Sequence, residues 1–367
     1  MPYIRPTDHR QPDIAMDDAH HSNASTVLRG ALVGCGFFAA NQMRAWQELP
    51  GVAIAALCDR DAGRLAAFGD TFGIEHRFDD IETLLTQMAV DFVDIAAPTP
   101  AHETLVTAAA HYGVDIICQK PFAGSLATAR RLINICRKHG VSLTVHENFR
   151  WQHAVRRVAE LIGEGRIGRP FFGRISYRSG FDVFANQPYL ATLERFIIQD
   201  LGIHTLDMAR ALFGDVVRLS CETGRVNPDI AGEDHATLML RHEAGCVSVV
   251  DCSYATTLAD DPFPQSLIEV DGDRGSIRLA ADFQLTIHGP GGSATVEDVT
   301  PTWPAWSEAP WNVIQESVVA LQGDWIERRR AREPAPTAGP DNFNTLALVE
   351  AAYQSAATGQ SVEPERW

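Results

Sequence analysis

Short apolar runs alternate with helical patterns over residues 27–147, and this alternation constrains the fold more than any other feature of the chain. Runs such as VAIAALCD at 52–59 and DFVDIAAP at 91–98 are followed by helical patterns at 61–72 and 101–112. Strands that alternate with helices in this way form a parallel sheet that is covered on both faces. We therefore predict an α/β domain with a doubly wound parallel sheet.

Residues 148–367 show a different pattern, in which several strand-like segments follow one another with few helices between them. Sequences such as RHEAG and DGDRG separate these segments and are typical of hairpin turns. The pattern predicts a second, α+β domain with an antiparallel sheet. The expected strands lie at 171–180, 216–226, 235–240, 246–255, 265–270, 275–280 and 283–289. The expected helices lie at 152–163, 193–213, 312–330 and 342–357, and the Pro- and Trp-rich segment 301–311 is expected to be a structured loop.

The length and charge of the chain limit its classes of function. Its 367 residues are too many for one small core and suggest about two domains. The 31 Lys and Arg residues against 47 Asp and Glu residues give a formal net charge of −16. This acidic balance argues against a general nucleic-acid binder and against adhesion to an anionic membrane. No apolar run approaches the ~18 residues of a membrane span. From the charge and from this absence we expect neither a nucleic-acid partner nor a membrane partner.

The cysteines indicate a reducing environment. There are seven, an odd number, and no CxxC spacing occurs. We therefore expect reduced thiols and a cytoplasmic protein, without a disulfide framework or a zinc cluster. Residues 1–26 are polar and lack the apolar segment of a signal peptide, so we expect them to form a flexible tail.

A GxGxxA motif directly follows the first apolar run and opens the first helical pattern. Gly34 permits the tight turn, Gly36 lets the backbone approach a pyrophosphate, and the small Ala39 allows close contact between helix and strand. The N-terminus of the helix then faces the phosphates. In this strand–turn–helix context the motif predicts a dinucleotide site, with Phe37 and Phe38 in the same turn.

Two charged residues at the end of the second apolar run bear on the choice of dinucleotide. Asp59 stands where an acid that binds the ribose of NAD belongs, and its charge would repel the 2′-phosphate of NADP. Arg60 follows it and is either a solvated surface charge or a partner for that 2′-phosphate. Together these positions favour NAD as the cofactor over NADP.

The ends of two later strands add further candidates, because the carboxyl ends of parallel strands line the ligand site of a doubly wound sheet. Pro98 and Thr99 follow one strand and are expected on the nicotinamide side. His102 is also a candidate for cofactor binding, although a surface position in the first helical turn is the favoured interpretation of its side chain. Gln119 and Lys120 end the next strand. Lys120 is either a functional lysine or a surface lysine whose stem covers apolar groups.

The segment DLGIHTLD places three polar residues, Asp200, His204 and Asp207, at helical spacing. With offsets of four and three positions, these side chains can share one helical face. A histidine flanked by carboxylates can be oriented as a general base near neutral pH. One alternative is a capping aspartate beside a surface histidine. The other is a metal site, which lacks a third ligand at recognisable spacing, so we expect no metal.

Taken together, these motifs resemble the glucose–fructose oxidoreductase/inositol dehydrogenase family, usually called Gfo/Idh/MocA. The resemblance covers about residues 27–360 and includes the family's glycine motif, the Asp after the second strand, a Lys-Pro pair and the D-x-G-x-H-x-x-D helix. It implies a Rossmann domain joined to an α+β domain with an open, mostly antiparallel sheet, and a substrate between the two. The exposed sheet face would build homodimers or homotetramers. Gln119 replaces the family's Glu, so the resemblance does not carry over the charge that this Glu places near the lysine.

The resemblance also suggests substrate contacts. The family's Asn-Tyr-Arg-like element occurs as Asn148-Phe149-Arg150, whose polar side chains either contact the substrate or bridge the two domains. The segments QKPF, HENFRW, RSGFDVF, QPYL and ERFIIQDLGIH are similar to those of bacterial D-apiose dehydrogenases, a subgroup that acts on a branched pentose. Further candidates for the sugar pocket are Trp151, Phe181, Asp182 and Tyr189. Core packing is the slightly favoured interpretation of Phe181 and Trp151.

These resemblances imply an NAD-dependent sugar dehydrogenase, and oxidation of D-apiose at C1 to its lactone is the narrowest expectation. In this hypothesis His204 is the general base, and Asp200 orients it or binds an adjacent hydroxyl. Lys120 stabilises the charge that develops on the reacting oxygen, or shares the proton relay with His204. The alternatives are an inositol, polyol or other aldose dehydrogenase, an NAD-dependent glycosidase and a non-catalytic sugar sensor.

Overall fold

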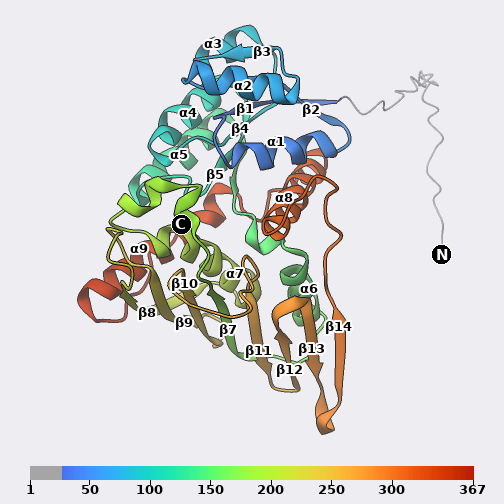
Figure 1. Ribbon diagram of the computed structural model, residues 1–367, viewed down its shortest axis with the longest axis vertical. Coiled ribbons are helices and arrows are strands. Elements are labelled where there is room, and N and C mark those ends of the chain that lie inside the picture. The colour runs from blue at the N-terminus through green and yellow to red at the C-terminus, as the bar shows by residue number, and fades with distance from the viewer. Residues whose placement is uncertain (1–26) are drawn as a thin grey trace, which may run out of the picture.

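The first sheet of the computed structural model is fully parallel and lies in a Rossmann domain with helices on both faces (Figure 1). The structure describes residues 27–367, so the expected tail at 1–26 lies outside the described residues. The strands follow the order β3-β2-β1-β4-β5-β6, and the doubly wound sheet is confirmed. They are β1 (Leu28–Val33), β2 (Val52–Cys58), β3 (His76–Phe78), β4 (Phe92–Ile95), β5 (Asp115–Gln119) and β6 (Leu143–His146). The helices are α1 (Ala39–Glu48), α2 (Ala62–Phe72), α3 (Ile81–Gln87), α4 (Thr99–His111) and α5 (Leu126–His139).

Two short elements of this domain, β3 and α3, have no counterpart in the expected pattern. β3 contains three residues and α3 contains seven. Periodicity identifies elements from windows of about 11–18 residues, so such short elements leave little signal. Asp80 does provide a local one, since its side chain accepts the backbone N–H of Thr83 and caps α3.

Asp94 on β4 is a buried carboxylate beneath α1. Gln42 and Trp46 of α1 each donate a side-chain hydrogen bond of 2.7 Å to it. Burial raises the pKa of Asp94 to about 7, against the opposing effect of these two hydrogen bonds. The Asp94 carboxyl titrates near pH 4 in the unfolded chain. Between pH 4 and pH 7 it therefore carries a proton only in the folded protein. The stabilising effect of that proton is therefore present at low pH and is lost as the pH rises through about 7.

We expect the free energy of unfolding of the wild type to fall relative to that of Asp94→Asn as the pH rises from 5 to 7.5. The greatest expected slope of this difference is about 1.4 kcal/mol per pH unit. Denaturant titrations of both proteins at several pH values measure it. A difference that does not change with pH would show that Asp94 titrates alike in the folded and unfolded chains.

The second sheet has eight strands and is antiparallel except where β7 and β10 lie side by side in parallel. The order is β14-β13-β12-β11-β7-β10-β9-β8, which confirms a mostly antiparallel sheet. Its strands are β7 (Pro170–Arg178), β8 (Val216–Gly224), β9 (His235–His242), β10 (Val247–Ser253), β11 (Leu267–Gly272), β12 (Gly275–Leu279), β13 (Gln284–His288) and β14 (Ala294–Asp298). The sequence pattern predicts the first seven, but β14 is mostly exposed and has no apolar alternation.

The helix expected at 193–213 begins later than its pattern suggests. A π-helical turn (η4, Ile198–Gly202) leads into α7 (Ile203–Phe213). Before it, the carboxylate of Glu233 accepts the backbone N–H groups of Phe196 and Ile198. These N–H groups are therefore satisfied outside a helix, which accounts for the late start. Among residues 27–367, no helix is long and apolar enough to cross a membrane.

The last two helices, α8 (Asn312–Ala331) and α9 (Gly339–Thr358), return from the second sheet to the Rossmann domain. Trp325 of α8 packs against Trp46 and Phe92, with ring centroids 6.0 and 4.7 Å away. Phe343 of α9 is fully buried in the cluster that contains the β5 and β6 side chains. Leu348 and Val349 of α9 belong instead to the core cluster of the second sheet, which also contains residues of α6 (His153–Gly163) and α7, so this helix packs against both domains.

Candidate active site

The turn between β1 and α1 has the geometry that a dinucleotide requires. Gly34 has a φ of 100°, and a Cβ there would lie 2.8 Å from the backbone carbon of Ala96. A Cβ at Gly36 would meet nothing within 4 Å, so this position borders open space. No side chain of the described residues caps α1, which leaves its first N–H groups available for an anion. The residues present therefore fit the pyrophosphate of a dinucleotide.

Asp59 follows β2 and holds the glycine turn in place. Its two carboxylate oxygens accept the backbone N–H groups of Cys35 and Asp61 at 2.7 and 2.8 Å. Each oxygen keeps a lone pair for a ribose hydroxyl. Arg60 is exposed and makes no hydrogen bond within the described part of the chain.

His102 is buried, and the surface position favoured from the sequence is wrong. Its side chain lies between the carbonyl oxygens of Ala97 and Pro121, at 2.8 and 3.1 Å. These carbonyls follow β4 and β5, so the ring links the ends of the two strands. A contact from Pro98 or Thr99 to the nicotinamide stays a prediction, and His102 supports the backbone beside them.

Lys120 follows β5 and reaches across to the π-helical turn before α7. Its Nζ donates to the backbone carbonyl of Asp200 at 2.6 Å and to the Asp200 carboxylate at 3.0 Å. Both side chains are mostly buried, with 16% and 21% of their surfaces exposed. The lysine is therefore held at the junction of the two domains and does not extend into solvent.

His204 of α7 contacts a residue that the sequence analysis did not single out. Its Nδ1 hydrogen bonds to Oε1 of Glu147, the residue after β6. Asp200, a candidate for orienting His204, instead binds Lys120 through its carboxylate. Asp200 lies in the π-helical turn and His204 in the α-helix that follows, so the regular α-helical spacing assumed from the sequence does not hold between them. Phe149 stacks on the imidazole with ring centroids 3.9 Å apart.

The electrostatics of this pair favour a neutral imidazole beside a carboxylate of unusually high pKa. Burial and the charge of Lys120 hold the pKa of His204 well below its ordinary value, against the opposing charges of Asp200 and Asp207. Burial raises the pKa of Glu147 to about 7. A neutral imidazole has one nitrogen free to accept a proton, as a general base requires.

Comparisons with known proteins decide the family of this chain. Residues 28–147 match the model of the oxidoreductase family with an NAD-binding Rossmann fold, and residues 155–278 match the GFO/IDH/MocA C-terminal domain. The chain belongs to the Gfo/Idh/MocA oxidoreductase family. Its cofactor is NAD, in agreement with the glycine turn and with Asp59.

Three relatives illustrate the similarity. A D-apiose dehydrogenase of Rhizobium rhizogenes is 52% identical over 92% of this chain and 98% of its own. A second D-apiose dehydrogenase, from Paraburkholderia graminis, is 53% identical over 93% of this chain and 92% of its own. The solved structure of an oxidoreductase from Agrobacterium radiobacter, in complex with NAD+, L-tartaric acid and magnesium, is 52% identical with a TM-score of 0.91. It covers 92% of this chain, and this chain covers 98% of it.

Gln119 marks a departure from the Gfo/Idh/MocA pattern, and the structure shows what its amide does. The amide oxygen accepts the backbone N–H of Lys120 at 3.0 Å, and the amide nitrogen lies 3.4 Å from Nδ1 of His146. His146 is fully buried, and burial lowers its pKa to about 3. A neutral amide thus faces a neutral imidazole, and Gln119 adds no negative charge beside the lysine.

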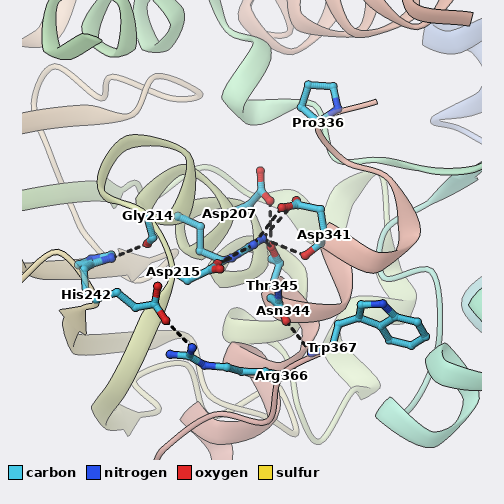
Figure 2. Close-up of polar contacts among 12 residues, drawn as sticks. Asp207, Gly214, Asp215, His242, Pro336, Asp341, Asn344, Thr345, Arg366 and Trp367 are labelled. Atoms are coloured by element: carbon cyan, nitrogen blue, oxygen red, sulfur yellow. Dashed lines mark hydrogen bonds and ion pairs between the residues drawn. The ribbon is translucent and has the colours of Figure 1, made fainter. Parts of the chain in front are cut away.

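Arg150 lies against a buried aspartate, and its hydrogen bonds point to a structural role within the second domain. Its Nε and one terminal nitrogen donate to the two oxygens of Asp207, each at 2.5 Å, and the other donates to the carbonyl of Pro336 at 3.2 Å. Figure 2 shows Asp207 and Thr345 close together, and the Thr345 hydroxyl donates to Asp207 at 2.9 Å. Asn148 likewise donates to Ser317 Oγ of α8 at 2.6 Å. The polar groups expected at the substrate thus bind the C-terminal segments.

Replacing Arg150 by methionine is expected to destabilise the fold by about 3–5 kcal/mol, because Asp207 would remain buried without its partner. The side chain of Asp207 has no exposed surface, and among residues 27–367 only the Thr345 hydroxyl would still donate to it. The matched control is Arg131→Met, which removes an exposed pair with Glu103 and should change stability by less than about 1 kcal/mol. Denaturant unfolding of both variants measures the difference, and equal small losses would contradict the expectation.

Aromatic residues connect the cofactor turn with the candidate sugar residues. Phe181 stacks on Phe263 at 3.9 Å and meets Trp311 edge-on at 5.6 Å. Trp311 also meets Phe37 of the glycine turn, with ring centroids 5.7 Å apart. Trp311 therefore bridges the two parts of the site. In the sequence, only the Pro- and Trp-rich composition of its segment pointed to Trp311. A loop has no periodicity, so the sequence did not indicate which residues Trp311 contacts.

The other predicted sugar residues make local contacts. The Asp182 carboxylate accepts the backbone N–H groups of Phe184 and Ala185. The Tyr189 hydroxyl donates to the side chain of Gln187 at 3.0 Å, and 57% of Tyr189 is exposed. Trp151 has a buried indole nitrogen without a hydrogen-bond partner in the described residues. Substrate contact by these residues remains a prediction.

Proposed function

We propose that this chain is an NAD-dependent D-apiose dehydrogenase that oxidises the sugar at C1 to its lactone. Two relatives named for this activity share 52% and 53% identity with nearly the whole chain. The observation that carries the proposal is the arrangement of Lys120, Asp200 and His204, which brings an ammonium and a neutral imidazole to the junction beside the NAD-binding domain.

The proposed mechanism divides the reaction between two groups of the chain. Bound NAD+ supplies the acceptor for the hydride that leaves the oxidised carbon. His204 takes the hydroxyl proton, because its pKa keeps the imidazole neutral. Lys120 donates to the same oxygen and stabilises the negative charge that develops there. The carbonyl and carboxylate of Asp200 fix the ammonium group in direction, which reduces reorganisation during the step.

The test is the rate of NAD+ reduction with a panel of D-apiose, other pentoses, hexoses and inositols. We expect D-apiose to have the highest kcat/KM and the product to be its lactone. A higher kcat/KM with an inositol would move the assignment to another dehydrogenase of the family, as would a preference for a different aldose. NADP+ in place of NAD+ completes the panel, and Asp59 predicts weaker binding of it.

We further propose that the chain assembles as a homodimer or homotetramer in the cytoplasm. Met239 and Val249 pair on the face of the second sheet that Phe213 and Gly173 do not occupy, and 56% of Met239 is exposed. This partly exposed apolar pair on an open sheet face supports a contact between copies. All seven cysteines are free and buried, which supports a reducing compartment. Light scattering of the wild type and Met239→Asp tests the assembly, and a monomeric wild type would refute it.

A further inference from the structure

Glu147 has a position that the proposed mechanism does not yet use. It directly follows β6, and none of its surface is exposed. One carboxylate oxygen contacts Nδ1 of His204, and the other is buried without a partner. A buried carboxylate with an unsatisfied oxygen is unfavourable for stability by itself. A role in folding alone therefore does not explain this carboxyl.

The ring of His204 is held so that its two nitrogens have separate environments. Phe149 lies parallel to it, with an interplanar angle of 6° and a centroid distance of 3.9 Å. Stacking fixes the plane of the ring, and Glu147 fixes the direction of Nδ1. Nε2 has no hydrogen-bond partner among residues 27–367, and 6% of the side chain remains exposed. Nε2 is therefore the nitrogen that an incoming hydroxyl can reach.

We propose that Glu147 is a positioning residue for His204, which it keeps in the Nδ1–H tautomer with the Nε2 lone pair directed to the substrate. The inference rests on the proposed function, because it assigns the base of that reaction. In the step, the substrate O–H bond breaks and an Nε2–H bond forms. The C–H electron pair leaves as hydride to NAD+ while the C=O bond forms. Glu147 then stabilises the imidazolium, and the proton passes to solvent in the next cycle.

The surrounding charges are consistent with this role. The charges of Lys120 and Arg150 lower the pKa of Glu147 and favour its ionised form, although burial has the larger effect and raises it to about 7. Asp200 and Asp207 favour the imidazolium of His204. His146 on β6 is neutral, because burial lowers its pKa to about 3. Glu147 is thus the only carboxyl bound to the imidazole within the described residues.

The central test is Glu147→Gln, which preserves the shape of the side chain and removes its charge. We expect kcat with D-apiose to fall by about 10²–10⁴-fold, while the dissociation constant of NAD+ stays within about threefold of the wild-type value. In the wild type the acidic limb of the pH profile of kcat/KM should lie near pH 7, where the Glu147 carboxyl titrates. In Glu147→Gln only His204 of the pair can titrate, and the limb should move to lower pH. That direction follows because burial and the charge of Lys120 both lower the pKa of the His204 that remains.

A readout independent of turnover is the ¹⁵N NMR spectrum of histidine-labelled protein without substrate. We expect His204 to be the Nδ1–H tautomer in the wild type and to populate the Nε2–H tautomer in Glu147→Gln. If the wild type oxidises none of the sugars, the proposed function fails but the tautomer assignment is still tested. If the sugar is oxidised and the tautomer is the same in both proteins, the role of Glu147 is refuted.

Two controls separate positioning from structural damage. Glu316→Gln neutralises another buried carboxyl, which binds His153 and Arg156, and should leave kcat within about twofold. Combining Glu147→Gln with His204→Gln should lower kcat no further than His204→Gln alone, because one residue acts through the other. Additive losses would show that Glu147 acts independently and would overturn the proposal.

Discussion

Replacing Lys120 by alanine is expected to lower kcat by about 10²–10³-fold, the loss typical of removing one donor to a developing oxyanion. The ammonium group is held by two oxygens of Asp200, at 2.6 and 3.0 Å, so its direction is fixed before substrate arrives. Water that enters the space of the missing side chain has no such fixed orientation. Steady-state kinetics with D-apiose, together with NAD+ titration, measure the effect.

The composition of the chain offers an unusually clean control for this experiment. The sequence contains only two lysines, Lys120 and Lys138. Lys138 lies near the end of α5 and is exposed. Lys138→Ala should leave kcat unchanged. Lys120→Met keeps most of the apolar stem and should lose as much activity as Lys120→Ala. Full activity in Lys120→Met would show that the stem of this side chain matters and its charge does not.

The parts of the molecule that were predictable share one property, which is that their signal is local in sequence. The turn after β1 requires a positive φ at Gly34, which glycine adopts readily. Asp59 directly follows β2, so the strand before it sets its position. Lys120 was identifiable because a charge at the end of an apolar strand is unusual. Each of these inferences uses a few neighbouring residues and the rule that parallel strands end at one edge.

The parts that were not predictable depend on pairings between distant segments. Glu147 and His204 are 57 positions apart, and so are Arg150 and Asp207. Helical spacing suggested that Asp207 would flank His204, but a two-pronged contact with Arg150 occupies both of its oxygens. Such competition among partners is decided by tertiary packing and leaves no periodic signal. Glu147 therefore looked like a domain boundary and not like a site residue.

Two glycines of the same turn are expected to differ in what their replacement by alanine changes: cofactor binding for Gly36 and stability for Gly34. Gly36→Ala should leave the free energy of unfolding within about 0.5 kcal/mol of the wild type, because the new methyl group meets nothing within 4 Å. The same methyl group would occupy the space through which the pyrophosphate approaches the backbone. We therefore expect the dissociation constant of NAD+ to rise at least about tenfold, which corresponds to about 1.4 kcal/mol.

Gly34→Ala should instead destabilise the folded chain by about 1–3 kcal/mol before any cofactor binds. Its φ of 100° is rarely adopted by other residues, and the added Cβ would lie 2.8 Å from the backbone of Ala96 on the neighbouring strand. Thermal unfolding without cofactor and calorimetric titration with NAD+ separate the two effects. If Gly36→Ala bound NAD+ as the wild type does, the dinucleotide would not approach the backbone at this turn. If Gly34→Ala were as stable as the wild type, the turn would have relaxed away from β4, and its role in shaping the site would be refuted.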